Sequence, residues 1–288
     1  MKEQALALVR SATDPGQGLN RLREYIQVLV LRSLHECEAF RPLAFVGGTA
    51  LRLLHGLPRF SEDLDFTGVG SVPTGTAMES AVREACAHAV QLLDPYAPVE
   101  IVCERHTERN PHPGSQEAFD IRARFPWHRQ PHTRVMVEVA LDEKLLRPPS
   151  RRPILHDYGE PLGLEIATYS LEEIVAEKLR AILQHAKALE NRGWVRSRAR
   201  DYYDLWRILG SWSARLDVSS FDELLREKCT TRSVTFSGSD SFFPEAMLAL
   251  VEKTWAQWLG PLVPDLPACE RVIGDLRPLI EKLLSNKP

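Results

Sequence analysis

Two short stretches in the first quarter of the chain contain residue types suited to phosphate chemistry. In residues 45–49 (FVGGT), an apolar run stops at two glycines. Residues 63–66 (DLDF) place Asp63 and Asp65 two positions apart, so on a strand both carboxylates would point to the same face. Two oxygen ligands on one rigid face are suited to Mg²⁺ that also binds substrate phosphates. The pattern predicts a site for a metal-bound phosphate compound.

The elements around these residues must position them. Residues 43–46 are predicted to form a buried strand, residues 49–55 a short helix that ends before Pro58, and residues 63–67 a second strand. Free N–H groups at the start of the helix favour an anion, so Gly48 and Thr49 are predicted to contact phosphate oxygens. The alternative is a tight turn followed by a solvated acidic strand edge. The core-facing pattern of residues 64 and 66 argues against that alternative.

The rest of the chain divides into a mixed half and a helical half. Strands are predicted at residues 99–104, 119–125, 135–141 and 164–168, helices at 19–40 and 77–93, and a loop at 147–153. Beyond residue 168 only helices are predicted, at 171–189, 199–209, 221–229, 243–259 and 271–284. The predicted fold class is α/β (α+β), with one domain at 1–168 and an α-helical domain at 169–288.

The composition limits the classes of function. With 44% hydrophobic and 26% charged residues, the chain is typical of soluble globular proteins. Its formal net charge of −3 excludes a polycation, so any nucleic-acid surface must be local. The five cysteines form no CxxC pair, which indicates reduced thiols and a cytoplasmic protein. No signal peptide is predicted, and the apolar run 28–31 is too short to cross a membrane.

Together with two later segments, these motifs resemble the AbiEii nucleotidyltransferase family. The similarity lies in residues 47–49 (GGT), 59–66 (RFSEDLDF), 171–179 (LEEIVAEKL) and 198–206 (RARDYYDLW). The family comprises toxins of type IV toxin–antitoxin and abortive-infection systems and includes the MenT toxins. The resemblance implies a polymerase-beta-like nucleotidyltransferase fold for residues 1–168. It covers residues 40 to 210, and the last part of the chain carries no recognised motif.

The helical half contributes two further candidate residues. Lys178 falls within the apolar stripe of its predicted helix, and a lysine on a buried face is costly without an anionic partner. It is predicted to reach triphosphate oxygens; the alternative is a lysine whose amine extends into water. Asp201 lies on the flank of the next apolar stripe, whereas Asp204 is predicted to turn away from it. Asp201 would act as a base or orient Lys178, or would merely be favoured by the helix dipole.

Enzymes of this class usually need a third carboxylate on a neighbouring strand. Glu138 is the only acid within the apolar run 135–139 (VMVEV), so it is the predicted third metal ligand. Asp120 and Asp142 are the alternatives for that role. If Glu138 has no such role, it would be an exposed residue on one face of a two-sided strand.

A basic stretch at residues 191–200 is a candidate for contact with RNA. It contains Arg196 and Arg198 together with Trp194, and such residues bind RNA backbones and stack on bases. The alternative is a solvated charged loop that joins two helices.

These observations predict a metal-dependent enzyme whose helical domain completes the active-site cleft. The catalytic residues would be Asp63, Asp65, Lys178 and Asp201, with Mg²⁺ (or Mn²⁺) as cofactor and a nucleoside triphosphate as substrate. The resemblance implies that a nucleotide, a pyrimidine such as that of CTP, is transferred to RNA at the 3′ end of tRNA, which blocks translation. It also implies a separate antitoxin protein. The alternatives are a nucleotidyltransferase for small molecules such as antibiotics, and an inactive nucleotide-binding module.

Overall fold

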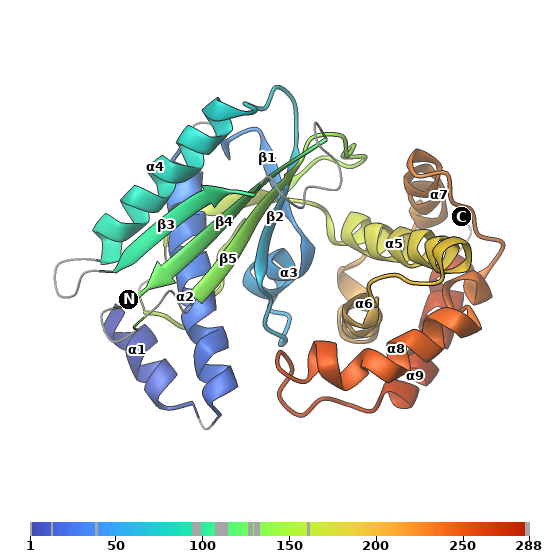
Figure 1. Ribbon diagram of the computed structural model, residues 1–288. Coiled ribbons are helices and arrows are strands. Elements are labelled where there is room, and N and C mark those ends of the chain that lie inside the picture. The colour runs from blue at the N-terminus through green and yellow to red at the C-terminus, as the bar shows by residue number, and fades with distance from the viewer. Residues whose placement is uncertain are drawn as a thin grey trace. The chain divides into compact units, whose positions relative to one another are not determined.

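The chain forms two units, each continuous in sequence (Figure 1). In this computed structural model the first unit is Met1–Tyr169 and the second is Ser170–Pro288. The structure describes residues 2–12, 14–37, 40–93, 99–106, 115–125, 129, 133–159 and 162–285. The change from strands to helices along the chain coincides with the division between the units.

A seven-stranded mixed sheet organises the first unit, in the order β3-β4-β5-β2-β1-β7-β6. The strands are β1 (Leu43–Val46), β2 (Asp63–Gly68), β3 (Glu100–Arg105), β4 (Gln116–Arg124), β5 (Thr133–Ala140), β6 (Ser150–Pro153) and β7 (Glu165–Thr168). At the centre of the sheet, β2 runs parallel to β5 and antiparallel to β1. The segments singled out for chemistry therefore occupy the middle of the sheet.

In its described residues the first unit also has four α-helices: α1 (Lys2–Arg10), α2 (Pro15–Glu36), α3 (Gly47–His55) and α4 (Thr76–Leu93). Asp14 caps α2, because its carboxylate accepts a hydrogen bond from the Gln17 backbone N–H at 3.0 Å. Helices α2 and α4 pack against each other and against the sheet, as Figure 1 shows. Their apolar faces join the inward side chains of the central strands, such as Phe45 and Phe66, in one continuous core.

The sequence prediction missed two elements of the first unit. Residues 147–153 were expected to form a loop, but residues 150–153 form β6, so this prediction is wrong. As an edge strand, β6 hydrogen-bonds only to β7 in the sheet, and edge strands tolerate charged residues and proline. Such a strand lacks the apolar alternation on which the prediction depended. Helix α1 was not predicted at all.

The second unit consists of helices α5 (Leu171–Arg192), α6 (Ala199–Ser211), α7 (Phe221–Thr231), α8 (Glu245–Leu259) and α9 (Cys269–Ser285), with two short 3₁₀ turns. Ser170 caps α5 by accepting a hydrogen bond from the Glu173 backbone N–H at 3.2 Å, and Gly193 ends the helix with a φ of 73°. α7 packs on α5, while α8 and α9 pack on α6. The predicted fold class, an α/β unit followed by a helical one, is confirmed.

No helix in the described part of the chain combines the length and the apolar character that a membrane crossing requires. All five cysteines are free thiols, and Cys86, Cys103 and Cys229 are buried. The expectation of unpaired, mostly buried thiols is therefore met.

Candidate active site

The predicted metal ligands lie on two neighbouring parallel strands. Leu64 and Phe66 of β2 are buried in the core. Asp63 and Asp65 alternate with them, so both carboxylates point to the opposite face of the strand. The register pairs Asp65 of β2 with Glu138 of β5, which puts these side chains on the same face of the sheet. The structure thus brings the three acids to one face, while metal binding by them stays a prediction.

The two alternatives to Glu138 have different surroundings. Asp120 of β4 is buried, and its carboxylate binds Arg122 and Arg134 at 2.8 Å each. Burial alone would raise the pKa of Asp120, but the two guanidinium groups outweigh burial and hold the pKa below its ordinary value. Asp142 is exposed and follows the end of β5. Glu138 remains the acid that the strand register aligns with Asp65.

The two glycines allow the start of α3 to approach β2 closely. Gly47 has a φ of +83°, in the region that favours glycine, and an added Cβ would collide with the Asp65 carboxylate. A Cβ on Gly48 would collide with the Arg59 guanidinium and lie 2.8 Å from the Ser61 Oγ. A larger residue at Gly47 would be strained by its positive φ and would push against the Asp65 side chain, whereas at Gly48 the side chains of Arg59 and Ser61 would have to move.

Thr49 has a structural role that the sequence did not reveal. Its side chain is fully buried, and its hydroxyl donates a hydrogen bond to the backbone carbonyl of Asp63. This bond ties the first turn of α3 to the first residue of β2. The predicted contact between Thr49 and phosphate would therefore use its backbone N–H.

Arg59 is the residue near these glycines that sequence reasoning left without a role. Only 2% of Arg59 is exposed, and its Nη1 donates a hydrogen bond to the Phe60 carbonyl at 2.9 Å. The closeness of its Nη2 to the Gly48 backbone places a guanidinium charge at the start of α3. The sequence signal that could have identified Arg59 was its place at the start of the run RFSEDLDF, between the two glycines and the two aspartates.

In the second unit, Lys178 of α5 is bound by two aspartates of α6. The Lys178 Nζ lies 2.8 Å from the Asp201 Oδ1 and 2.7 Å from the Asp204 Oδ2. Lys178 and Asp201 are brought together, as the sequence suggested. The expectation that Asp204 turns away is wrong, since Asp204 is fully buried against Lys178. Lys178 is thus a buried cation with two carboxylate partners.

Two further side chains complete this group. The Arg198 Nη1 donates to the Asp201 Oδ2 at 3.1 Å, and the Arg198 Nη2 lies 2.6 Å from the His185 Nε2. The His185 Nδ1 lies 3.0 Å from the Ala181 carbonyl oxygen. These partners fit a neutral imidazole that donates at Nδ1 and accepts at Nε2. We call Lys178, Asp201, Asp204, Arg198 and His185 the Lys178 cluster.

Burial and charge set the protonation states in the Lys178 cluster. Burial and the nearby Arg198 charge lower the pKa of His185 to about 4, so the imidazole is neutral at pH 7. Burial alone would raise the pKa of Asp201, but Lys178 and Arg198 outweigh burial and hold the pKa far below its ordinary value. The carboxylate of Asp201 is therefore ionised and binds protons weakly.

A second buried lysine was missed by the sequence analysis. The Lys228 Nζ of α7 lies 2.7 Å from the Glu173 Oε1 and 2.8 Å from the Glu177 Oε1, both on α5. Arg180 also binds Glu177. Burial alone would raise the pKa of Glu177, but Arg180 and Lys228 outweigh burial and lower the pKa. We call these four residues the Lys228 cluster.

The residues predicted to contact RNA separate into two environments. Arg196 lies over the ring of Trp258 with its guanidinium carbon 5.1 Å from the ring centroid, and Arg200 lies over the same ring at 5.5 Å. Arg198 instead belongs to the Lys178 cluster. Trp194 is 74% exposed. A basic and aromatic surface therefore adjoins the start of α6.

Comparison with known proteins adds to this geometry. A family model described as "Nucleotidyl transferase AbiEii toxin, Type IV TA system" matches residues 29–286. The chain belongs to the AbiEii nucleotidyltransferase toxin family. The family resemblance inferred from the motifs is confirmed, and the match extends into the C-terminal helices, where no motif was recognised. No curated protein matches the chain.

Solved structures share the AbiEii fold of this chain. MenT4, a nucleotidyltransferase toxin from Mycobacterium tuberculosis H37Rv, is similar with a TM-score of 0.64 and 20% identity, over 99% of this chain and 90% of that chain. JHP933 from Helicobacter pylori is similar with a TM-score of 0.55 and 18% identity, over 92% of this chain and 91% of that chain. A putative nucleotidyltransferase from H. pylori is similar with a TM-score of 0.54 and 19% identity, over 91% of this chain and 92% of that chain.

Proposed function

We propose that this AbiEii nucleotidyltransferase transfers a nucleotide from a nucleoside triphosphate to RNA, with the 3′ end of tRNA as acceptor, and so blocks translation. The observation that carries the proposal is the alignment of Asp63, Asp65 and Glu138 on one face of the sheet, beside the glycine turn that begins α3. The RNA acceptor and a pyrimidine nucleotide such as that of CTP rest on the resemblance to MenT toxins.

Asp63, Asp65 and Glu138 are the residues that would hold Mg²⁺ or Mn²⁺. Mg²⁺ is commonly bound by one or two carboxylates together with substrate phosphates and water. Among the described residues, no group of three or more His, Cys, Asp or Glu side chains is arranged to hold a metal ion. Asp63, Asp65 and Glu138 therefore fit an ion that binds together with the triphosphate and takes further ligands from its phosphates and from water. Such an ion would offset phosphate charge and lower the pKa of the attacking hydroxyl.

The start of α3 would bind the triphosphate. The backbone N–H groups of Gly48 and Thr49 lie in the first turn, where the helix offers them no acceptor and the helix dipole favours an anion. The Thr49 hydroxyl is occupied by the Asp63 carbonyl, so it leaves only the backbone of Thr49 for this contact. Arg59 would add positive charge beside Gly48.

Lys178 would supply positive charge to the departing diphosphate. In the proposed reaction the acceptor hydroxyl oxygen bonds to the α-phosphorus, the hydroxyl proton passes to solvent, and the bond from the α-phosphorus to the bridging oxygen breaks to release diphosphate. Asp201 would orient Lys178 through their 2.8 Å contact. The alternative role of Asp201 as a base is less suited to the site, because a carboxylate with so low a pKa accepts a proton weakly.

Arginine and tryptophan side chains around the start of α6 would contact the RNA acceptor. Arg196 and Arg200 would bind phosphates, and the exposed ring of Trp194 offers a surface on which a base can stack. Arg198 remains a predicted RNA contact, although its bonds to Asp201 and His185 favour a positioning role.

A transfer assay tests the proposal. The purified protein is incubated with Mg²⁺ and each labelled nucleoside triphosphate, with total RNA and, separately, with a panel of aminoglycosides. We expect label on tRNA 3′ ends, no label with Asp65→Ala, and full labelling with the surface control Asp222→Ala. Label on the aminoglycosides alone would favour the small-molecule alternative. Label on neither acceptor, from protein that is folded, would favour the inactive module.

Salt dependence tests the RNA surface separately. Binding to phosphates releases counterions, so RNA affinity should fall steeply with salt concentration, and Arg196→Gln should flatten that slope. A slope that is unchanged in Arg196→Gln would remove Arg196 from the RNA surface and leave the metal site unaffected.

The type IV toxin–antitoxin family implies an antitoxin partner. We expect it to be encoded directly upstream as a winged-helix protein. Co-expression of that neighbouring protein should restore growth to cells that produce this chain, whereas cells that produce the inactive Asp65→Ala variant should need no rescue.

A further inference from the structure

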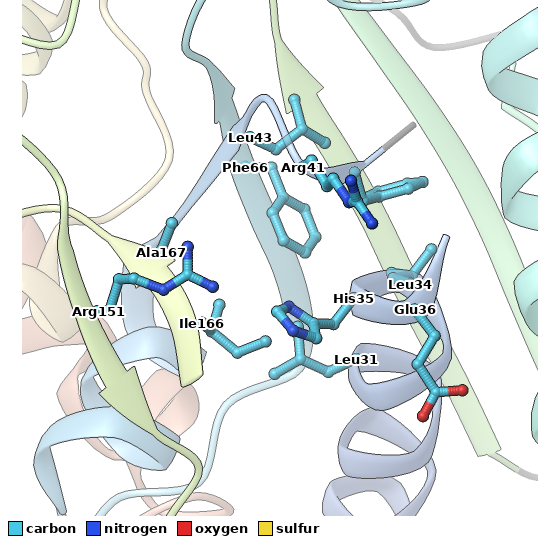
Figure 2. Close-up of a pocket in the computed structure, with 11 residues that line it drawn as sticks. Leu31, Leu34, His35, Glu36, Arg41, Leu43, Phe66, Arg151, Ile166 and Ala167 are labelled. Carbon is cyan, nitrogen blue, oxygen red and sulfur yellow. The ribbon is translucent and has the colours of Figure 1, made fainter. Parts of the chain in front are cut away.

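A cavity of about 540 Å³ lies in the first unit, between α2 and the strands β1, β2, β6 and β7 (Figure 2). We call it the His35 cavity. A neighbouring hollow of about 670 Å³ shares His35 and Arg151 with it and is otherwise lined by residues 153–154 and 162–165. Volumes of this size are typical of sites for small organic ligands.

Three basic side chains line the His35 cavity. They are His35 of α2, Arg41 of the following turn and Arg151 of β6. Arg151 donates a hydrogen bond to the backbone carbonyl of Glu165 at 3.3 Å, and no carboxylate of the described residues forms an ion pair with it. Burial and the charges of Arg151 and Arg41 lower the pKa of His35, although Glu36 opposes them. The cavity wall is therefore basic.

Among the described residues that line the His35 cavity, the acid is Glu36, and its carboxylate has other partners. The Glu36 Oε1 lies 3.2 Å from the Arg32 Nε, and the Glu36 Oε2 lies 3.4 Å from the His88 Nδ1. Figure 2 shows the carboxylate directed away from His35 and Arg151. The basic wall consequently favours an anionic occupant.

The rest of the His35 cavity is apolar. Leu31 and Leu34 of α2 face Leu43 of β1, Phe66 of β2 and Ile166 of β7, and each of these side chains is at most 5% exposed. The Phe66 ring projects toward the cavity in Figure 2. An aromatic or other flat apolar body would be stabilised against this floor.

We propose that the His35 cavity binds a small aromatic anion, with its ring against Phe66 and Ile166 and its phosphate or carboxylate between His35 and Arg151. The site is distinct from the proposed nucleotide site, because Phe66 and Asp65 point to opposite faces of β2. A bound ligand would rest on the back of the strand that carries the two aspartates. The proposal does not depend on the proposed nucleotidyl transfer.

Titration with 1-naphthyl phosphate and with 1-naphthoate tests the proposal, with binding measured by calorimetry on the whole protein. We expect at least one of the two anions to bind, and 1-naphthol, which lacks the anionic group, to bind at least about tenfold more weakly, since hydrogen bonds to charged groups are worth that much. Binding of the phosphate alone, or of both anions, identifies which acidic group the cavity accepts. Failure of both anions to bind at millimolar concentration would overturn the proposal.

Two variants locate the binding. Arg151→Gln should weaken the anion about tenfold, whereas Arg83→Gln, an exposed arginine of α4 paired with Glu79, should leave the affinity unchanged. The bound anion should also raise the pKa of His35, which is measured by NMR of the imidazole protons. Equal affinity in Arg151→Gln and the unaltered protein, an unchanged His35 signal, or displacement by Mg²⁺ with a non-hydrolysable triphosphate would each contradict this location.

Discussion

The Lys178 cluster and the Lys228 cluster are built alike: each joins a lysine to two carboxylates and an arginine in the helical unit. They differ in access to solvent. The Lys178 side chain is 10% exposed and the Lys228 side chain is 1% exposed, while in both clusters one carboxylate partner is fully buried and the other is 13–15% exposed. A ligand could approach the first lysine, but the second is enclosed by protein.

Because both lysines are buried and ion-paired, burial of a charge does not by itself indicate a catalytic function. Lys228 links α7 to α5 through Glu173 and Glu177, and both glutamates are used in that link. Lys178 keeps partial exposure and lies in a segment that matches the family motif. We therefore infer a structural role for the Lys228 cluster and propose a catalytic role for Lys178, and four sets of substitutions can test the difference.

The largest effect is expected for Lys228→Met. Removing the lysine leaves Glu173 buried without its lysine and takes one of two basic partners from Glu177, so the free energy of unfolding should fall by about 3–5 kcal/mol. Nucleotide transfer per folded molecule should be unchanged. Denaturant unfolding and turnover corrected for the folded fraction measure both quantities. The exposed Lys253→Met is the matched control, with an expected change within about 0.5 kcal/mol.

Lys178→Met should differ from Lys228→Met in its effect on turnover. Turnover per folded molecule should fall by about 10²-fold or more, because the proposed mechanism gives Lys178 the positive charge that offsets the departing diphosphate. Stability should also fall, since Asp204 is left buried without its lysine. Adding Asp204→Asn to Lys178→Met should restore stability without restoring turnover. Recovery of turnover in that double variant would mean that Lys178 is structural.

The two arginines provide a smaller, paired test. Arg198→Gln should lower kcat by about tenfold with little change in KM, because Asp201 loses a charged hydrogen bond that holds it against Lys178. Arg180→Gln, in the Lys228 cluster, should leave kcat unaltered. Conservative Arg198→Lys should recover part of the activity. Equal losses of kcat in Arg198→Gln and Arg180→Gln would contradict the proposed difference between the two clusters.

The smallest effect concerns pH. The pKa of His185 falls from an ordinary value of 6.5 to about 4 on folding, so the unfolded chain binds a proton more readily than the folded one. The stability contributed by neutral His185 is present above pH 6.5 and is lost as the pH falls toward 4. His185→Gln should therefore flatten the decline in unfolding free energy across this range. An unchanged decline would indicate that His185 titrates normally in the folded protein.

The sequence predicted most elements, because amphipathic periodicity depends on local burial. It also placed Asp63 and Asp65 on one strand face, since alternation alone decides that. It did not predict β6, whose edge position permits Arg151, Arg152 and a proline. Such a strand carries little periodic signal.

The errors at Asp204 and Lys228 have a common physical cause. Both residues are held by charges on α5, and a helix's own sequence does not state which neighbour will face it. Strand register posed a similar problem: Glu138 could be chosen as a candidate from its apolar surroundings, but its alignment with Asp65 required the parallel pairing of β2 and β5. Contacts between elements distant in sequence were therefore the part that reasoning from local patterns could not supply.

The sheet order has a consequence for how the protein is made. β1 lies between β2 and β7, yet β7 is the last strand of the chain to be synthesised. While residues 47–164 emerge from the ribosome, the backbone of β1 has no strand on its second side. An open strand edge on a nascent chain is a template for pairing with other chains, so a ribosome that stalls before residue 165 would release an aggregation-prone fragment. Once β7 has been made, it pairs with β1 on one side and with β6, which was made earlier, on the other. This pairing closes the open edge of β1 before the helical unit is complete.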